Sequence, residues 1–172
     1  MKIRLYGTVN DSIVDGPGLR YSVFTQGCLH HCPGCHNPKS HDLQGGYLED
    51  TDVIMAEILK NPLLDGVTIS GGEPFLQPVA LVELAKGIKQ HGLHLMIYSG
   101  YTYEEILDLG ENERKLLSLC DVLVDGCFLI GQRSLSLLYK GSANQRIINI
   151  QASLKEKCVS IQKINDYGEF IE

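Results

Sequence analysis

Three cysteines, Cys28, Cys32 and Cys35, lie within the stretch GCLHHCPGCHN at positions 27–37. Their spacing is C-x3-C-x2-C, and thiolates bind zinc or iron–sulfur clusters. A four-iron cluster held by three thiolates keeps one iron open for a further ligand, whereas a structural zinc normally takes four protein ligands. The spacing therefore favours an iron–sulfur cluster with an open iron. The other cysteines stand singly along the chain and are expected to be small buried apolar residues: Cys120, Cys127 and Cys158.

Two other uses of this loop stay open at the level of the residues. A histidine of the same stretch, His30, His31 or His36, could complete a zinc site, although a closed site within one loop would be unusual. Thiol redox chemistry is the second alternative.

The elements around this loop alternate between short apolar strands and helices, which predicts an α/β fold with parallel strands joined by right-handed crossovers. Ligands bind at the C-terminal ends of such strands. Four polar motifs follow four predicted strands, so we expect them to meet at one edge of one sheet. We expect strands at 20–26, 66–70, 93–99, 121–126 and 145–150, and helices at 49–60, 78–92 and, as one or two helices, 103–119.

The motif SGGEP at 70–74 is the second candidate part of a site. Gly71 and Gly72 lack a Cβ and let the backbone approach a ligand closely. The same letters also suit a plain turn from a strand to a helix, with Glu73 near the helix N-terminus and Pro74 in its first turn. Its place after a strand, beside the cysteine loop, favours a ligand site.

Further polar residues stand where strands end. Asp125 could bind a cation or a ribose, or cap the next turn, and Ser99 could line a cofactor pocket together with Tyr98, which could equally be a core residue. The turn DGPGLR at 15–20 could shape the rim of the site or be a plain turn with a surface arginine, Arg20. GSANQR at 141–146 could anchor a cofactor or a partner through Asn144 and Arg146, or be a turn before the last strand.

Length and composition set limits on the class of protein. The chain has 172 residues, 44% hydrophobic and 21% charged, which suits one soluble domain over residues 1–172. No apolar run is long enough for a membrane span, and the start MKIRLYGTVND is too polar for a signal peptide, so a cytoplasmic protein with reduced thiols is expected. The net charge of −6 and the lack of a basic block argue against nucleic acid as a direct partner.

The cysteine loop resembles the signature of radical S-adenosylmethionine enzymes. With DGPGLR before it and GGEP after it, the chain is similar to the activating enzymes of glycyl radical enzymes, and VLVDGCF at 122–128 and KGSANQR at 140–146 resemble the branch that acts on anaerobic ribonucleoside-triphosphate reductase. The resemblance runs from about residue 5 to residue 148. Two positions depart from related sequences: Gly34 stands where an aromatic residue is common, although CPGC occurs in the reductase branch, and Cys127 stands where a lysine is common.

This resemblance implies a fold, cofactors and site residues. The fold would be an incomplete parallel (βα) barrel. Cys28, Cys32 and Cys35 would bind one 4Fe–4S cluster per chain, and S-adenosylmethionine would chelate the open iron. The cofactor-binding residues expected from motif position are Asn37 near the sulfonium, Gly71, Gly72 and Glu73 at the amino group, and Ser99 and Asp125. His36 would shield the cluster, and no protein residue is expected to be catalytic.

The resemblance also implies a reaction and partners. Reductive cleavage of S-adenosylmethionine would give a 5′-deoxyadenosyl radical, which takes a hydrogen atom from a glycine of the anaerobic reductase. A reduced flavodoxin or ferredoxin would supply the electron, since no further group of cysteines could hold a second cluster. Two alternatives remain: an activase of another glycyl radical enzyme, such as pyruvate formate-lyase, and a zinc-binding, non-catalytic interaction module.

Overall fold

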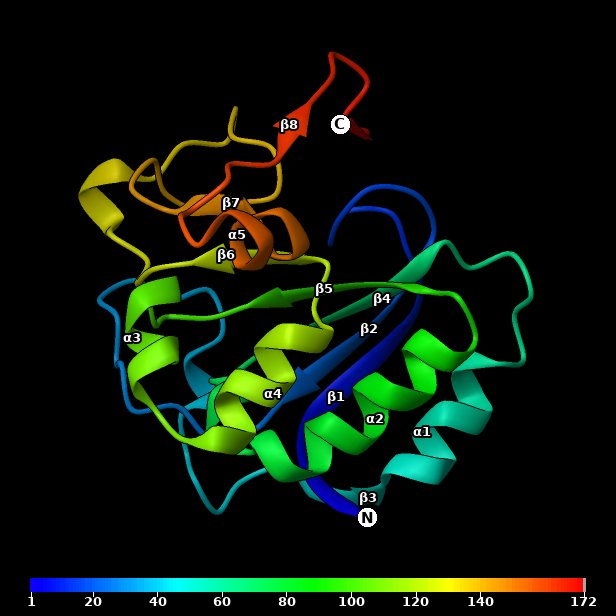
Figure 1. The fold of residues 1–172 in the computed structure, drawn as a ribbon. Helices are drawn as coiled ribbons and strands as arrows, with labels where there is room; N and C mark the ends of the chain where they lie inside the picture. Colours follow the sequence, from blue (N-terminus) through cyan, green and yellow to red (C-terminus); the bar gives the residue numbers. More distant parts are fainter. Residues whose placement is uncertain (172) are drawn as a thin grey trace.

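A seven-stranded mixed sheet forms the centre of the protein in a computed structural model, which describes residues 1–171 (Figure 1). The strand order is β3-β1-β2-β4-β5-β6-β7. The four central strands, β2, β4, β5 and β6, are parallel, while β1, β3 and β7 join the sheet antiparallel. The strands are β1 (Lys2–Ser12), β2 (Arg20–Thr25), β3 (Tyr47–Asp50), β4 (Gly66–Gly71), β5 (His94–Tyr98), β6 (Val122–Asp125) and β7 (Arg146–Asn149).

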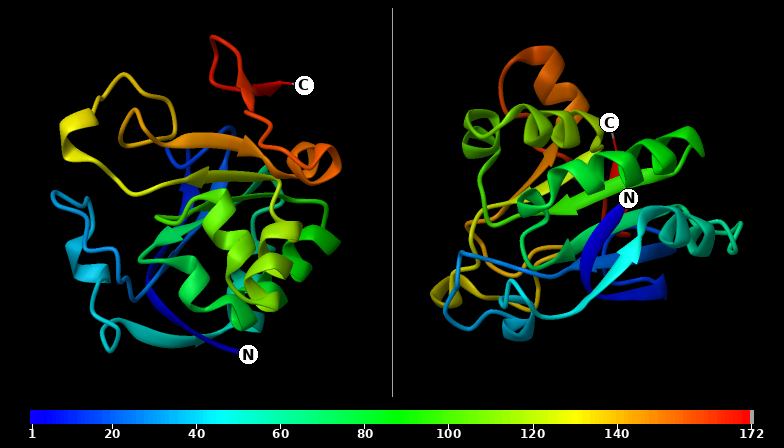
Figure 2. Two further views of the ribbon diagram at one scale, coloured as in Figure 1. Left: turned by 60° about the vertical axis from the view of Figure 1, so that its left-hand side comes forward. Right: turned by 90° about the horizontal axis from the view of Figure 1, so that it is seen from below.

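Helices α1, α2 and α4 cover one face of this sheet, and α5 follows β7 at the far edge (Figures 1 and 2). The crossovers between parallel strands carry α1, α2, and the pair α3 and α4. The helices are α1 (Thr51–Ile58), α2 (Pro78–Gln90), α3 (Tyr103–Asp108), α4 (Glu111–Leu119) and α5 (Ile150–Glu156); three short 3-10 helices, η1 (Pro38–Ser40), η2 (Pro74–Leu76) and η3 (Ile130–Gln132), and a hairpin of β8 (Lys163–Ile164) and β9 (Phe170–Ile171) complete the structure.

The core follows from the apolar pattern of these elements. The central strands are buried on both faces, which explains their nearly continuous apolar sequences. Leu95 of β5 belongs to the main apolar core, whereas the next residue, Met96, faces the opposite side of the sheet and is fully buried in a second apolar cluster. On α2, Leu81 and Ile88 fall on one helical face and are also fully buried. The packed core between the sheet and its helices holds the C-terminal ends of the parallel strands in fixed positions. The loops that follow these strands are therefore also fixed.

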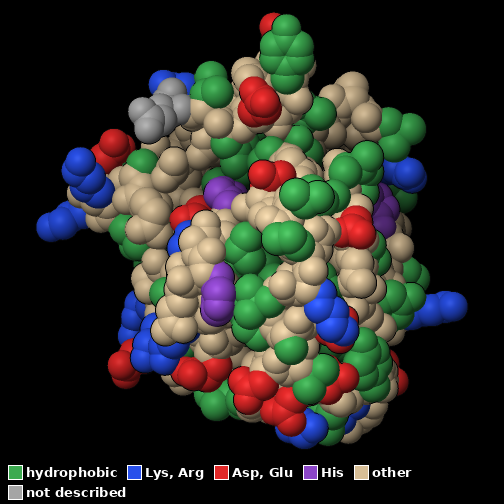
Figure 3. Space-filling view, turned by 90° about the vertical axis from the view of Figure 1, so that its right-hand side faces the viewer, with side chains coloured by type: hydrophobic (Ala, Val, Ile, Leu, Met, Phe, Trp, Pro, Cys, Tyr) green, Lys and Arg blue, Asp and Glu red, His purple; other side chains and the backbone are tan. Residues whose placement is uncertain are grey.

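Most predicted elements are confirmed, and the stretch 103–119, expected as one or two helices, forms two helices on either side of Gly110. The α/β class is confirmed, and the expected parallel pairing holds for the central strands. The prediction missed β1, β3 and α5, and it did not anticipate that the edges of the sheet are antiparallel. Among residues 1–171, no helix is both long and apolar enough to cross a membrane. On the face shown in Figure 3, basic side chains lie scattered among acidic and apolar ones.

Candidate metal centre and cofactor cavity

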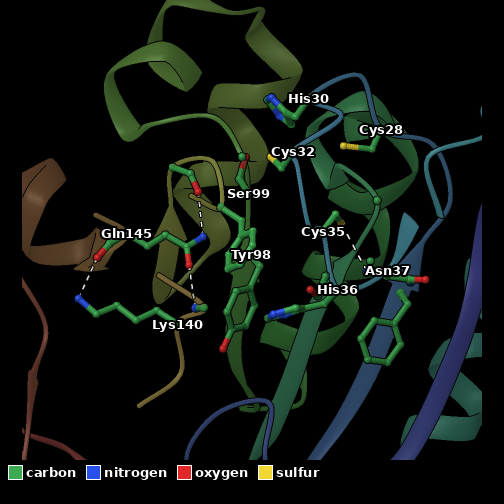
Figure 4. A pocket seen from close by; sticks show the side chains of 18 of the residues that line it. Cys28, His30, Cys32, Cys35, His36, Asn37, Tyr98, Ser99, Lys140 and Gln145 are labelled. Carbon is green, nitrogen blue, oxygen red and sulfur yellow. Dashed lines mark hydrogen bonds between the residues drawn. The ribbon is translucent and has the colours of Figure 1, made fainter. Parts of the chain in front are cut away.

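A cavity of about 480 Å3 opens at the C-terminal ends of the parallel strands. The three cysteines of the motif line it. Four of the residues expected to bind the cofactor line it as well: Asn37, Gly71, Gly72 and Ser99. The cysteine loop forms one wall, Lys140 and Gln145 stand opposite, and Tyr98 and Ser99 lie between them (Figure 4). Residues from four separate loops thus meet at one edge of the sheet, as the order of the motifs along the chain predicts.

The cysteine loop is closed on itself by backbone hydrogen bonds between its two ends. The N–H of Gly27 donates to the carbonyl of Ser40 at 2.8 Å, and the N–H of Cys28 donates to that of His41 at 3.1 Å. Cys28 is buried and burial raises the pKa of its thiol, while Cys32 and Cys35 are half-buried. Inside the loop the N–H of Asn37 points to Cys35 Sγ at 3.4 Å, a contact of the kind that orients and tunes metal-bound sulfur.

The two glycines of SGGEP are required by a close crossing of two backbones. The N–H of Gly72 donates to the carbonyl of Thr25 at 2.7 Å, and the N–H of Glu73 donates to that of Gly27 at 2.7 Å. A Cβ on Gly72 would lie 2.2 Å from the Gly27 oxygen, and Gly71 has a φ of 98°. These two hydrogen bonds form a strap between the end of β4 and the start of the cysteine loop, at a crossing that leaves no room for a side chain.

Glu73 and Asp125, both expected to bind the cofactor, lie behind the cavity wall, and each is 1% exposed. Asp125 Oδ2 accepts from the N–H of Tyr103 at 2.7 Å, at the first residue of α3, and its Oδ1 accepts from Arg146 Nε at 3.0 Å. This geometry is that of a cap, one of the three uses left open for this carboxylate. Both carboxylate oxygens of Glu73 likewise accept hydrogen bonds from protein donors.

The turn DGPGLR is held by a buried arginine. The alternative of a surface Arg20 is wrong: Arg20 is 1% exposed, and burial lowers its pKa to about 10. Its Nε donates to Thr68 Oγ1 at 2.6 Å, and Thr68 Oγ1 donates to the carbonyl of Asp15 at 2.8 Å. The Asp15 carboxylate, which accepts from Ser12 and Ser22, lines the cavity. The motif therefore builds part of the cavity rim.

Several cavity residues were not singled out from the sequence. The clearest is Gln145, inside GSANQR: its Oε1 accepts from the N–H of Gly141 at 2.8 Å and its Nε2 donates to the carbonyl of Gly126 at 2.9 Å. The flanking Asn144 donates to the carbonyl of Cys127 at 2.8 Å. The motif thus closes the loop after β6, and two of its residues, Gly141 and Gln145, line the cavity. Tyr139 and Lys140 carried no sequence signal beyond their nearness to this motif.

The histidines of the cysteine loop face away from a common point. His30 binds Glu73, His31 packs on His41 with ring centroids 5.2 Å apart, and His36 packs on Phe128 at 4.9 Å. Among residues 1–171, no three His, Cys, Asp or Glu side chains converge closely enough to hold a single metal ion. His36 does line the cavity beside the cysteines.

The remaining cysteines differ from one another. Cys120 is fully buried, as predicted, and burial raises the pKa of its thiol strongly. The same prediction is wrong for Cys158, which is exposed: it directly follows Lys157, the left-handed residue that ends α5. Cys127 is half-buried next to Cys32, and burial together with that neighbour raises its pKa to about 11.

Comparison with known proteins decides between the remaining alternatives. The family described as a 4Fe-4S single cluster domain matches residues 14–148, most of the chain. The chain belongs to this 4Fe–4S single-cluster family. The match includes the three cysteines, the GGEP strap and the GSANQR loop, and it excludes the reading of the chain as a zinc-binding interaction module.

Curated proteins that are similar to this chain carry activating functions in their names. The anaerobic ribonucleoside-triphosphate reductase-activating protein of Haemophilus influenzae is 36% identical over 145 residues, 78% of this chain and 90% of the relative. The protein of the same name from Escherichia coli K12 is 31% identical over 150 residues, 81% of this chain and 94% of the relative. The pyruvate formate-lyase-activating enzyme of Clostridium pasteurianum is 40% identical over 113 residues, 60% of this chain and 48% of the relative. The resemblance to activating enzymes of glycyl radical enzymes is thereby confirmed.

The cavity fits the cofactor that this family is described by. Three thiols stand on one wall, the backbone of Gly71 and Gly72 is exposed to the cavity without side chains, and Asn37 lies next to Cys35. A 4Fe–4S cluster takes thiolate ligands, and three of them leave one iron for a ligand that lies in the cavity.

Proposed function

We propose that the chain is the activating enzyme of an anaerobic ribonucleoside-triphosphate reductase, in which it generates a glycyl radical by reductive cleavage of S-adenosylmethionine. The observation that carries this proposal is the strap between Gly72 and Thr25 and between Glu73 and Gly27, because it brings the glycine motif against the three cysteines in one cavity. The names of relatives that align over nearly their whole length support the reductase as the target.

In this reaction the residues of the chain bind and orient the cluster and S-adenosylmethionine. Cys28, Cys32 and Cys35 would hold the cluster, the backbone of Gly71 and Gly72 would receive the amino group of S-adenosylmethionine, and Asn37 and Ser99, which line the same cavity, would contact the rest of it. When bound, the cluster supplies the electron that splits the sulfonium into methionine and a 5′-deoxyadenosyl radical, which takes hydrogen from the partner's glycine. The carboxylates of Glu73 and Asp125 contribute from behind the wall: Glu73 binds His30 of the cysteine loop, and Asp125 caps α3.

A protein substrate suits the shape of the fold. We infer an incomplete barrel formed by one domain, in which the parallel strands β2, β4, β5 and β6 provide the barrel-like part and the antiparallel β1 and β7 end it. Closure would bury the cavity, whereas Val14 lines it and is 75% exposed. An extended glycine-bearing segment can enter at this side. We further propose a cytoplasmic location and a reduced flavodoxin or ferredoxin as electron donor.

A direct test compares two candidate targets. The reconstituted protein, reduced anaerobically and given S-adenosylmethionine, is mixed with either an anaerobic ribonucleoside-triphosphate reductase or a pyruvate formate-lyase from the same cell. We expect a glycyl radical signal in electron paramagnetic resonance with the reductase alone. The second candidate, a pyruvate formate-lyase activase, is favoured by relatives with higher identity over a shorter stretch, 40% over 113 residues and 44% over 103 residues, and a signal with the lyase alone would establish it.

A further inference from the structure

The buried carboxylate of Glu73 has all of its hydrogen-bonding positions occupied by protein donors. Oε1 accepts from the N–H of Phe75 at 3.0 Å and from Ser99 Oγ at 2.9 Å. Oε2 accepts from the N–H of Gly100 at 2.8 Å and from His30 Nε2 at 2.8 Å. A carboxylate offers about four such positions, so Glu73 has none left for a ligand in the cavity. Its role in SGGEP must therefore be one of holding protein elements together.

The partner of particular interest is His30, because it stands in the cysteine loop between Cys28 and Cys32. Its Nε2 donates to Glu73, and its Nδ1 lies 3.6 Å from Cys127 Sγ. Its ring stands edge-on to Tyr101, with centroids 4.5 Å apart. The side chain is only 15% exposed, although the neighbouring Leu29 is 56% exposed.

The end of β5 leaves room for this imidazole. A Cβ on Gly100 would lie 2.4 Å from His30 Cδ2, so the ring occupies the space that a side chain at Gly100 would take. Figure 4 shows His30 and Cys32 on the same wall, above Ser99. The loop is thus joined twice to the residue that follows β4: by the backbone hydrogen bond from the Glu73 N–H to the Gly27 carbonyl, and by the His30 side chain in its middle.

We propose that His30 is a positioning residue, which holds the middle of the cysteine loop on the end of β5 through Glu73 and so sets the places of Cys28 and Cys32. Glu73 acts in the same clamp, and the contacts that SGGEP offers to the cavity come from its glycine backbone. We call this contact between His30 and Glu73 the clamp. The inference rests on the proposed function only for the identity of the cofactor that the loop binds, because the clamp is present in the chain without any cofactor.

The test is made on the metal-free, reduced protein. Hydrogen exchange of residues 27–37 and the alkylation rates of Cys28, Cys32 and Cys35 by N-ethylmaleimide are measured peptide by peptide. The His30→Ala variant loses a buried hydrogen bond to a carboxylate, so we expect exchange and alkylation of Cys28 to rise roughly tenfold or more. His30→Gln, whose Nε2 can still donate to Glu73, is expected to restore most of the protection. His31→Asn is the matched control and should behave like the wild type, since His31 is exposed and has a φ of 48°, which asparagine tolerates.

Wild-type exchange and alkylation in His30→Ala would overturn the proposal. Should that variant not fold, as judged by circular dichroism, His30→Gln is compared with His30→Asn, whose shorter side chain does not reach Glu73; equal rates in these two would also overturn it. A second readout separates positioning from general stability: after reconstitution, His30→Ala is expected to bind less iron and to show a raised KM for S-adenosylmethionine, both restored in His30→Gln. If the wild type cleaves no S-adenosylmethionine, the proposed function fails, while the exchange and alkylation results still decide on the clamp.

Discussion

The guanidinium of Arg146 lies against the carboxylate of Asp125, with Nε 3.0 Å from Oδ1, and reaches the exposed Glu104 on its other side at 3.1 Å. The pair joins β7 to the end of β6, and the same Asp125 caps α3 through the N–H of Tyr103. Two carboxylates raise the pKa of Arg146 above its usual range. The arginine of GSANQR therefore serves the architecture of the sheet edge, while Gln145 faces the cavity.

Removal of this arginine leaves a buried charge. In Arg146→Ala the carboxylate of Asp125, 1% exposed, loses its cation, and we expect the free energy of unfolding to fall by about 3–5 kcal/mol. Glu104→Gln is the matched control, because it removes the exposed partner of the same guanidinium and should cost at most about 1 kcal/mol. Urea unfolding of the metal-free protein measures both; equal losses would contradict the assignment of the buried pair as the stabilising one.

The glycine pair is predicted to be intolerant of any side chain. A methyl group at Gly72 would lie 2.2 Å from the carbonyl oxygen of Gly27. The two backbone segments cannot easily move apart, because the N–H of Glu73 is hydrogen-bonded to that same oxygen. We expect Gly72→Ala to lose about 1–3 kcal/mol of stability through this overlap and to bind less iron after reconstitution. Gly7→Ala is the control, since nothing lies within 4 Å of a Cβ there. Unchanged iron binding in Gly72→Ala would argue against the strap as a part of the site.

The six cysteines are predicted to differ in whether they bind the iron–sulfur cluster. Cys28→Ala, Cys32→Ala and Cys35→Ala should each lose most of the iron, which is about four atoms per wild-type chain for one cluster. Cys158→Ala, at an exposed position, and Cys120→Ala, in the core, should retain it. Cys127→Ala is the informative variant, because this thiol lies beside Cys32. We expect it to keep the iron as well, and loss of the cluster there would mean that the protein supplies a fourth ligand.

How far the sequence predicts this site depends on the range of the contacts. Cys28, Cys32, Cys35 and the glycine pair could be placed together because the order of strands and motifs fixes which loops meet. Glu73 and Asp125 were predicted to bind a cofactor. In the structure Glu73 accepts a hydrogen bond from Ser99, and Asp125 accepts one from Arg146. These partners lie more than 20 residues away along the chain, so no local sequence pattern reveals them. The antiparallel β1 and β3 were missed for the same reason, since their pairing is set by tertiary contacts and their exposed residues blur the strand pattern.

Stability should depend on pH through His94. Its Nδ1 lies 3.2 Å from Arg20 Nη2, and burial together with this cation lowers the pKa of His94 from 6.5 to about 4. Below pH 6.5 the unfolded chain binds a proton that the folded chain does not, so the free energy of unfolding falls as the pH drops from 6.5 towards 4, by at most about 1.4 kcal/mol per pH unit from this group. His94→Gln removes this contribution and should flatten the dependence, measured by urea unfolding between pH 7.5 and about 4. His91→Gln, at the exposed end of α2, is the control and should leave the slope unchanged.

The central claim is that three thiolates hold a cluster whose remaining iron binds S-adenosylmethionine for cleavage. The most direct measurement is the release of 5′-deoxyadenosine by the anaerobically reconstituted, dithionite-reduced protein. We predict release by the wild type and by Cys158→Ala, and none by Cys32→Ala. A wild-type protein that holds about four irons per chain and releases no 5′-deoxyadenosine would contradict the account.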